Sequence, residues 1–181
     1  MRRRLKRNGG KEMKKLLILG AGGFGHVIEE TARLLGYEDI AFLDDAAQGE
    51  KVLGKLASFE QQTRYEAAYP AFGNNRLRLF WLEQLRRAGF ETPTLIHPAA
   101  FVSPSARLEE GCAVLPKAVI QAGAVAGKAV LFNCGSLTDH DAVIGEGAHL
   151  CLGSIVKAGC GVPPCAKVEA GVVIDHEHPA R

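Results

Sequence analysis

A six-residue hydrophobic period dominates the second half of the chain. From residue 96 to residue 174, every sixth position without an insertion holds a residue suited to the interior, and most of these residues are aliphatic. In all but the last repeat, a small residue follows four places later. Neither the 3.6-residue period of a helix nor the two-residue alternation of a strand gives this register. A hexapeptide β-helix does, because each repeat is one short strand and one corner. The positions are Ile96, Val102, Leu108, Val114, Ile120, Ala126, Phe132, Thr138, Ile144, Leu150, Val156, Val162, Val168 and Ile174.

The corners of these repeats are expected to be tight. Gly often stands one place before the small residue, and Gly relieves the backbone conformations that a tight corner requires. Three repeats make one triangular coil, so residues eighteen apart are expected to stack on one another. The glycines at this position are Gly111, Gly123, Gly135, Gly147, Gly153, Gly159 and Gly171.

The chain before residue 96 follows a different pattern, in which apolar runs alternate with helical periodicity. This predicts a small parallel α/β domain. Its strands and helices are expected at 15–19, 26–36, 40–43, 67–72 and 76–89, with little pattern over 53–59. Pro70 places the third strand at a sheet edge or bulge, because proline donates no ladder hydrogen bond. The last helix is expected to bury an apolar face made of Leu77, Phe80, Trp81, Leu82 and Leu85.

These patterns divide the chain into a leader over 1–13, an α/β domain over 14–91 and a β-helix domain over 92–181. Residues 1–15 contain eight Lys or Arg and one acid, Glu12. The rest of the chain therefore has fourteen basic and nineteen acidic residues and a net charge near −5, although the whole chain is at +2. A basic tail on an acidic body predicts a disordered leader and argues against nucleic acid as a partner.

Composition narrows the setting of the protein. No apolar stretch approaches the roughly 20 residues that span a bilayer, and the leader lacks the apolar core of a secretory signal. The five cysteines are odd in number and form no Cys-x-x-Cys, so neither a disulfide framework nor a zinc ribbon is indicated. We therefore expect a reducing, cytoplasmic location.

A glycine-rich loop follows the first predicted strand. Gly20-x-Gly22-x-x-Gly25 is formally a dinucleotide fingerprint, which suggests NAD. The domain offers only about three strands, however, too few for a complete dinucleotide-binding domain. The loop and the helix N-terminus after it are still suited to a phosphate, so a ligand such as a nucleotide-sugar is the favoured interpretation. A purely structural turn is the alternative.

The clearest polar residue at an inward position of the repeat is Thr138, which is followed by Asp139, His140 and Asp141. The stacking of residues eighteen apart places alanines above and below His140 and glycines above and below Asp141, which leaves room for a ligand. A carboxylate beside an imidazole fixes its tautomer and raises its basicity, as a general base requires. The alternative is a solvated polar turn. The flanking residues are Ala122, Ala158, Gly123 and Gly159.

The remaining histidines carry less information. His149 alone favours a structural role, and His26 and His97 are uninformative individually. His176 and His178 are expected to lie in a flexible tail rather than in a metal site.

The chain beyond its first dozen residues resembles the PglD/NeuD-type sugar acetyltransferases. The resemblance implies a Rossmann-like subdomain followed by a left-handed β-helix of hexapeptide repeats. It rests on Leu17-Ile18-Leu19-Gly20-Ala21-Gly22-Gly23, Phe42-Leu43-Asp44-Asp45, Gly73-Asn74-Asn75-Arg76, Ile96-His97-Pro98-Ala99-Ala100, and Asn133-x-Gly135-x-x-x-Asp139-His140-Asp141 with His149.

The family implies transfer of an acetyl group from acetyl-CoA to the amino group of a nucleotide-linked amino sugar in surface-glycan biosynthesis, with no metal. By resemblance, His140 is the general base and Asp141 holds it. His149 is implied to lie near the acetyl-CoA thioester or to contact the donor or the acceptor, and the N–H of Ala158 is where we expect an oxyanion site. The implied nucleotide-sugar contacts come from Gly22, Gly23, Phe24, Asp44, Asp45 and Asn74. A homotrimer is implied, with active sites between adjacent β-helices.

Two features keep other functions open. Phe24 stands where many relatives have His, so acceptor contacts there are expected to differ. The family's later coils, which help to form the CoA groove, are expected to be shortened here. The alternatives are therefore O-acetylation of a sialic-acid-type sugar, or a non-catalytic trimer that binds nucleotide-sugars with a shortened CoA site.

Overall fold

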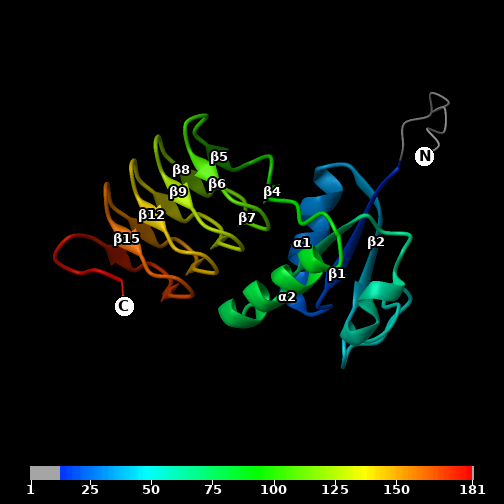
Figure 1. Ribbon diagram of the computed structural model, residues 1–181. Coiled ribbons are helices and arrows are strands. Elements are labelled where there is room, and N and C mark those ends of the chain that lie inside the picture. Colours follow the sequence, from blue (N-terminus) through cyan, green and yellow to red (C-terminus); the bar gives the residue numbers. More distant parts are fainter. Residues whose placement is uncertain (1–12, 181) are drawn as a thin grey trace, which may run out of the picture.

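The computed structural model describes residues 13–180, so most of the predicted leader lies outside the described residues. Within them the chain forms an α/β domain and a β-helix that pack side by side, as both expected architectures require (Figure 1). No helix between residues 13 and 180 is long and apolar enough to cross a membrane.

The α/β domain contains a three-stranded parallel sheet in the order β2-β1-β3. Pro70 ends the edge strand, as its missing N–H requires. Glycines mark the ends of the first helix: Gly22 is its N-cap, and Gly36, with a φ of +85°, follows its last turn. The elements are β1 (Lys14–Leu19), α1 (Gly23–Leu34), β2 (Tyr37–Leu43), η1 (Leu56–Gln61), β3 (Ala67–Pro70) and α2 (Asn75–Arg87).

Three sequence expectations for this domain need correction. α1 begins at Gly23 rather than residue 26, because the extended Gly22 already accepts the first helical hydrogen bond, from His26. A short 3₁₀ helix, η1, occupies a stretch that showed little pattern. The expected face of α2 is wrong in part: its buried positions are Arg78, Leu82 and Leu85, whereas the large apolar side chains of Leu77 and Phe80 are exposed.

The β-helix is confirmed strand by strand. Its fourteen two-residue strands form three parallel sheets, and every partner lies eighteen residues away. The first sheet contains β4 (Leu95–Ile96), β7 (Ala113–Val114), β10 (Leu131–Phe132), β13 (His149–Leu150) and β16 (Lys167–Val168). The second contains β5 (Phe101–Val102), β8 (Val119–Ile120), β11 (Leu137–Thr138), β14 (Ile155–Val156) and β17 (Val173–Ile174). The third contains β6 (Arg107–Leu108), β9 (Val125–Ala126), β12 (Val143–Ile144) and β15 (Gly161–Val162).

The coils stack into a triangular prism. The residues of the six-residue repeat form its core, because those from Val114 onward are buried and pack on one another. All seven corner glycines have φ between 63° and 71°. Four other corners adopt the same left-handed conformation without glycine, at Lys117, Ala129, Asp141 and Cys165. The corners are therefore as tight as the pattern predicted, and these four residues carry a backbone cost that glycine avoids.

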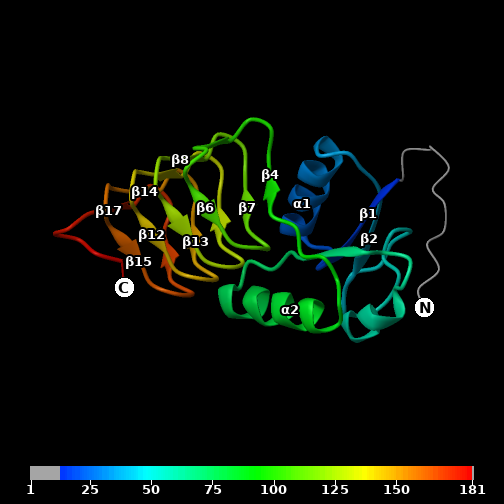
Figure 2. The same cartoon turned by 45° about the horizontal axis from the view of Figure 1, so that its top comes forward.

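The two domains share one apolar interface. Outward residues of the first sheet, including Leu95, Ala113 and Leu131, join a buried cluster with Ile18 of β1 and Ile28 of α1. α2 lies below the junction of the two domains (Figure 2), and its part from Asn75 to Leu82 follows the corners that join the third sheet to the first. We call this edge the docking vertex, and the edge between the second and third sheets the His140 vertex. The His140 vertex lies opposite the sheet that the α/β domain covers.

Candidate functional site

His140 and Asp141 form a polar pair on the His140 vertex. Nδ1 of His140 lies 2.8 Å from Oδ2 of Asp141, and the His140 amide donates to Asp139 Oδ1 at 2.8 Å. Both side chains of the pair are exposed. Because Asp141 accepts from Nδ1–H, Nε2 is left with its lone pair directed away from the carboxylate.

The hydrogen bond to Asp141 raises the pKa of His140, and the nearby charges of Asp139 and Asp141 act in the same direction. The imidazole is therefore a stronger base than an isolated histidine. Its free Nε2 is the atom that can take a proton from a ligand.

The stacking inferred from the sequence is confirmed around this pair. The Asp141 amide donates to Ala122 O at 3.0 Å, and the Gly159 amide donates to His140 O at 3.0 Å. A Cβ on Gly123 would lie 2.4 Å from Asp141 Oδ1, so the carboxylate occupies space that only glycine leaves free. Asp141 itself has a φ of +58°, which costs free energy that a glycine here would not.

His149 lies in a different environment. It begins β13, which pairs with β10 and β16 inside the first sheet, and its Nε2 is 3.3 Å from the Asn133 side-chain amide. Its Nδ1 is buried without a hydrogen-bond partner in the described chain. Burial lowers its pKa to about 4, and the positive charges of Arg78 and Lys167 act in the same direction. His149 is thus a neutral imidazole at physiological pH.

Within one chain, the structure does not bring His140 and His149 together. β11, β12 and β13 belong to three different sheets, so the corner between β11 and β12 and the start of β13 lie on different sides of the prism. His140 is on the vertex opposite the α/β domain, whereas His149 is on the sheet that this domain covers.

The glycine loop has two kinds of glycine. Gly25 is required structurally, because a Cβ there would lie 2.1 Å from Gly20 O. Gly22 and Gly23 are exposed and have open space around the position of a Cβ. No side chain caps α1, and no acidic residue lies in its first turn. The loop therefore presents the N-terminus of a helix to solvent, an arrangement suited to a phosphate.

The polar residues expected to hold a nucleotide make internal contacts. Asp44 Oδ2 accepts from the Ala21 amide at 2.7 Å, and this hydrogen bond is the main cause that lowers the Asp44 pKa. Asp45 Oδ1 accepts from the first amide of η1, at Leu56. Asn74 Oδ1 caps α2 by accepting from Leu77. These contacts shape the loops beside Gly22, and direct ligand contacts by the three side chains stay predictions.

Comparison with known proteins places this geometry in a family. A family model described as the PglD N-terminal domain matches residues 15–85. The acetyltransferase domain of PglB from Neisseria gonorrhoeae is 34% identical to this chain, with a TM-score of 0.72 and alignment over 90% of this chain and 91% of that chain. This chain belongs to the PglD/NeuD-type sugar acetyltransferases.

Two further structures support the fold of the family. PerB from Caulobacter crescentus, in complex with CoA and GDP-perosamine, is 28% identical, with a TM-score of 0.78 over 92% of this chain and 91% of that chain. WeeI from Acinetobacter baumannii shares the fold at 19% identity and a TM-score of 0.58, over 93% and 99% of the two chains. The Rossmann-like subdomain and the left-handed β-helix are therefore the fold of this acetyltransferase family.

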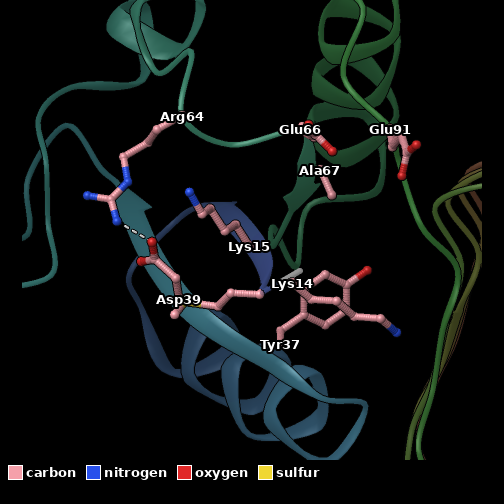
Figure 3. Close-up of a pocket in the computed structure, with 9 residues that line it drawn as sticks. Lys14, Lys15, Tyr37, Asp39, Arg64, Glu66, Ala67 and Glu91 are labelled. Carbon is pink, nitrogen blue, oxygen red and sulfur yellow. Dashed lines mark hydrogen bonds and ion pairs between the residues drawn. The ribbon is translucent and has the colours of Figure 1, made fainter. Parts of the chain in front are cut away.

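The two principal cavities of the described chain lie away from the family's predicted site residues. One, of about 700 Å³, lies where the sheet strands begin, at the end opposite the glycine loop. Lys14, Lys15 and Tyr37 line it together with Asp39 and Arg64, which form an ion pair (Figure 3). The second, of about 690 Å³, adjoins it at Glu66 and Glu91. His140, Asp141, Gly22 and Gly23 line neither cavity.

Sequence reasoning missed two polar features of this family member. The sequence pattern did not single out Arg78, which is fully buried at the domain interface. The end of the chain forms an ordered turn in which Asp175 accepts from Lys157 Nζ and from the His178 amide. No group of three or more His, Cys, Asp or Glu in residues 13–180 is arranged to hold a metal ion.

Proposed function

We propose that this protein transfers the acetyl group of acetyl-CoA to the amino group of a nucleotide-linked amino sugar, with His140 as general base. The observation that carries the proposal is the His140–Asp141 pair, exposed between alanine and glycine neighbours, in a chain 34% identical to the PglB acetyltransferase domain. The same PglB domain has been solved with acetyl coenzyme A, and PerB with CoA and GDP-perosamine.

Proton transfer explains the need for the pair. An amine that attacks a thioester must lose a proton, and Nε2 of His140 accepts it while Asp141 stabilises the imidazolium that forms. The C–N bond forms first and gives a tetrahedral oxyanion. Its collapse breaks the C–S bond, and the CoA thiolate that leaves takes up the proton. A base placed in this way contributes about 10²- to 10⁴-fold to the rate.

The oxyanion formed during attack needs a donor. The Ala158 amide is next to His140 in the stack and donates no hydrogen bond to any residue between 13 and 180. It is therefore available to the thioester oxygen, and a preorganised backbone donor of this kind stabilises the developing charge.

The complete site requires more than one copy of the chain. The glycine loop lies on the α/β domain, which covers the first sheet, whereas His140 lies on the opposite vertex. A sugar held at the loop of one chain can therefore meet the His140 vertex of another, which supports a homotrimer with sites between β-helices. The second sheet, which borders the His140 vertex, adds support because Phe101, Leu137 and Val173 on its outer face are exposed and apolar.

The decisive test is a thiol-release assay with acetyl-CoA and a panel of nucleotide-linked amino sugars. We expect turnover by the wild-type protein and a loss of about 10²-fold or more in His140→Ala. Because His140 is exposed, the melting temperature and oligomeric state of the variant should match the wild type. Wild-type turnover in His140→Ala would contradict the assigned role.

The two alternatives give different results in the same assay. An O-acetyltransferase would release thiol with hydroxyl acceptors and not with amino sugars. A non-catalytic binding protein would show a melting-temperature shift with nucleotide-sugars, no shift with acetyl-CoA and no thiol release.

A further inference from the structure

Arg78 is a fully buried arginine with no acidic partner within the described residues. Its guanidinium makes five hydrogen bonds, four of them to backbone carbonyls. Nε donates to Ala129 O, Nη1 to Phe72 O, and Nη2 to Gly147 O, all at 2.9 Å. Nη2 also reaches Ala148 O at 3.2 Å. The residue therefore joins the loop before α2 to two successive coils of the β-helix.

The carbonyls on the β-helix side form a ladder along the docking vertex. Ala129, Gly147 and Cys165 are eighteen residues apart, and each has a positive φ. In this conformation their carbonyls accept no hydrogen bond from a neighbouring coil in the described chain. Arg78 satisfies the first two, and Asn75 Nδ2 satisfies the third by donating to Cys165 O at 3.0 Å. Buried carbonyls of this kind are costly to leave unpaired.

α2 fits this ladder with about one helical turn for each coil. The rise of one turn is about 5.4 Å, and neighbouring strands lie about 4.8 Å apart. A Cβ on Gly111 would lie 2.3 Å from Leu82 Cδ1, so Leu82 uses the space that this glycine leaves open. The next corner along the vertex is Ala129, and Leu82 would have to repack beside its methyl group if α2 moved by one coil. In the observed register, Leu82 and the hydrogen bonds of Arg78 and Asn75 are satisfied together.

The ladder ends beside residues of the proposed site. Phe72 comes directly before the loop of Gly73 and Asn74, where a nucleotide is expected. Gly147 and Ala148 come directly before His149. The Arg78 guanidinium thus fixes the distance between the nucleotide loop and the strand that carries His149.

We infer that Arg78 and Asn75 are positioning residues that set the register of the α/β domain on the β-helix. This register also sets the position of the sugar acceptor relative to His149, a consequence that rests on the proposed function. Neither residue needs to touch a substrate. Loss of the register displaces the acceptor, and a displacement of about 1 Å in such a site lowers the rate by up to about 10²-fold.

The test compares Arg78→Met and Asn75→Ala with Arg87→Met. Arg87 is exposed at the far end of the same helix, and its side chain makes no hydrogen bond or ion pair with any residue in 13–180. We expect kcat/KM for the acceptor to fall about tenfold or more in the first two variants, while the acetyl-CoA KM stays within twofold. Asn75→Ala removes fewer bonds and keeps the test valid if Arg78→Met does not fold.

Hydrogen exchange supplies a readout that is independent of turnover. The amides of Leu131 and His149 donate to Ala148 O and Ala166 O, which are also acceptors for Arg78 and Asn75. Their exchange should accelerate at least tenfold, whereas that of the Val143 amide, on the third sheet, should not change. Arg87→Met should behave as the wild type.

Three results would overturn the inference. They are wild-type exchange at Leu131 and His149 in both variants, equal acceleration at Val143, or an unchanged kcat/KM for the acceptor despite local acceleration. Absence of transfer by the wild-type protein to any amino sugar would refute the proposed function instead, and the exchange arm would still decide whether the register depends on Arg78 and Asn75.

Discussion

Replacement of Asp141 by Gly is expected to separate stability from activity. Asp141 has a φ of +58°, and the residues stacked on it, Gly123 and Gly159, have φ of +71° and +66°. The fold therefore favours Gly at this corner, whereas the proposed chemistry needs a carboxylate 2.8 Å from His140 Nδ1. Asp141→Gly removes the carboxylate and relieves the backbone together.

The size of each effect follows from the structure. A left-handed conformation costs a residue with a Cβ about 1–2 kcal/mol, and the greater freedom of Gly in the unfolded chain offsets about 0.4–1 kcal/mol of that gain. The exposed His140–Asp141 pair contributes little to stability. We therefore expect a net stabilisation of about 0–1.6 kcal/mol, which raises Tm by up to about 6 °C in a chain of this length.

Activity should move in the opposite direction. Without Asp141 the imidazole loses its fixed tautomer and its raised pKa, and we expect kcat to fall by about 10²-fold. Asp141→Asn tests the pKa separately, because Asn tolerates the left-handed conformation. His140 must be neutral to accept a proton, so activity rises with pH through its pKa. The acidic limb of the kcat/KM profile should therefore move to lower pH in Asp141→Asn.

The assay pairs thermal unfolding with steady-state thiol release, and Lys117→Gly is the matched control. Lys117 is exposed on a different vertex and has a φ of +62°. Its replacement should give the same small rise in Tm with unchanged kcat. Wild-type turnover in Asp141→Gly would refute the role of the carboxylate, and a Tm lowered by several degrees would refute the argument from backbone conformation.

Two further predictions test the surroundings of the site. Gly123→Ala and Gly159→Ala carry the same backbone cost of about 1 kcal/mol. Only Gly123→Ala places a Cβ 2.4 Å from Asp141 Oδ1, so only this variant should lower kcat. Equal kcat in the two variants would contradict the packing argument. The depressed pKa of His149, about 4, means that protonation favours the unfolded state, and about 3 kcal/mol of stability should be lost as pH falls from 6.5 to 4. The free energy of urea unfolding should depend less on pH in His149→Gln than in the wild type over this range. Identical pH dependence in the two proteins would exclude protonation of His149 as the cause.

The β-helix was predictable because its signal is periodic and local. One inward residue in six and a tight corner four places later are enough to define the coil, and the stacking of residues eighteen apart then follows from counting. That counting places Ala122 and Ala158 beside His140, and the backbone hydrogen bonds confirm this placement. The role of the pair in catalysis is a separate prediction, because the coil geometry alone does not test it.

The helix at the interface was harder to predict because hydrophobicity gave the wrong face. Leu77 and Phe80 are strongly apolar, yet the buried positions are Arg78, Leu82 and Leu85, which are spaced as one side of a helix. An arginine at such a position was a usable signal, because its buried guanidinium needs acceptors. Their identity was not predictable, because they are backbone carbonyls that belong to the coils, and every corner offers similar ones.

The sequence also could not predict which sheet the α/β domain covers. The outward residues of the first sheet, such as Leu95 and Leu131, are apolar, but so are Phe101 and Leu137 on the second. Hydrophobic burial therefore favours both sheets about equally. In the observed arrangement the α/β domain covers the first sheet, and Leu82 of α2 packs over the open corner at Gly111. The second sheet is consequently left uncovered beside the His140 vertex. In the proposed trimer, assembly of the three chains buries this sheet and also completes the site around the general base.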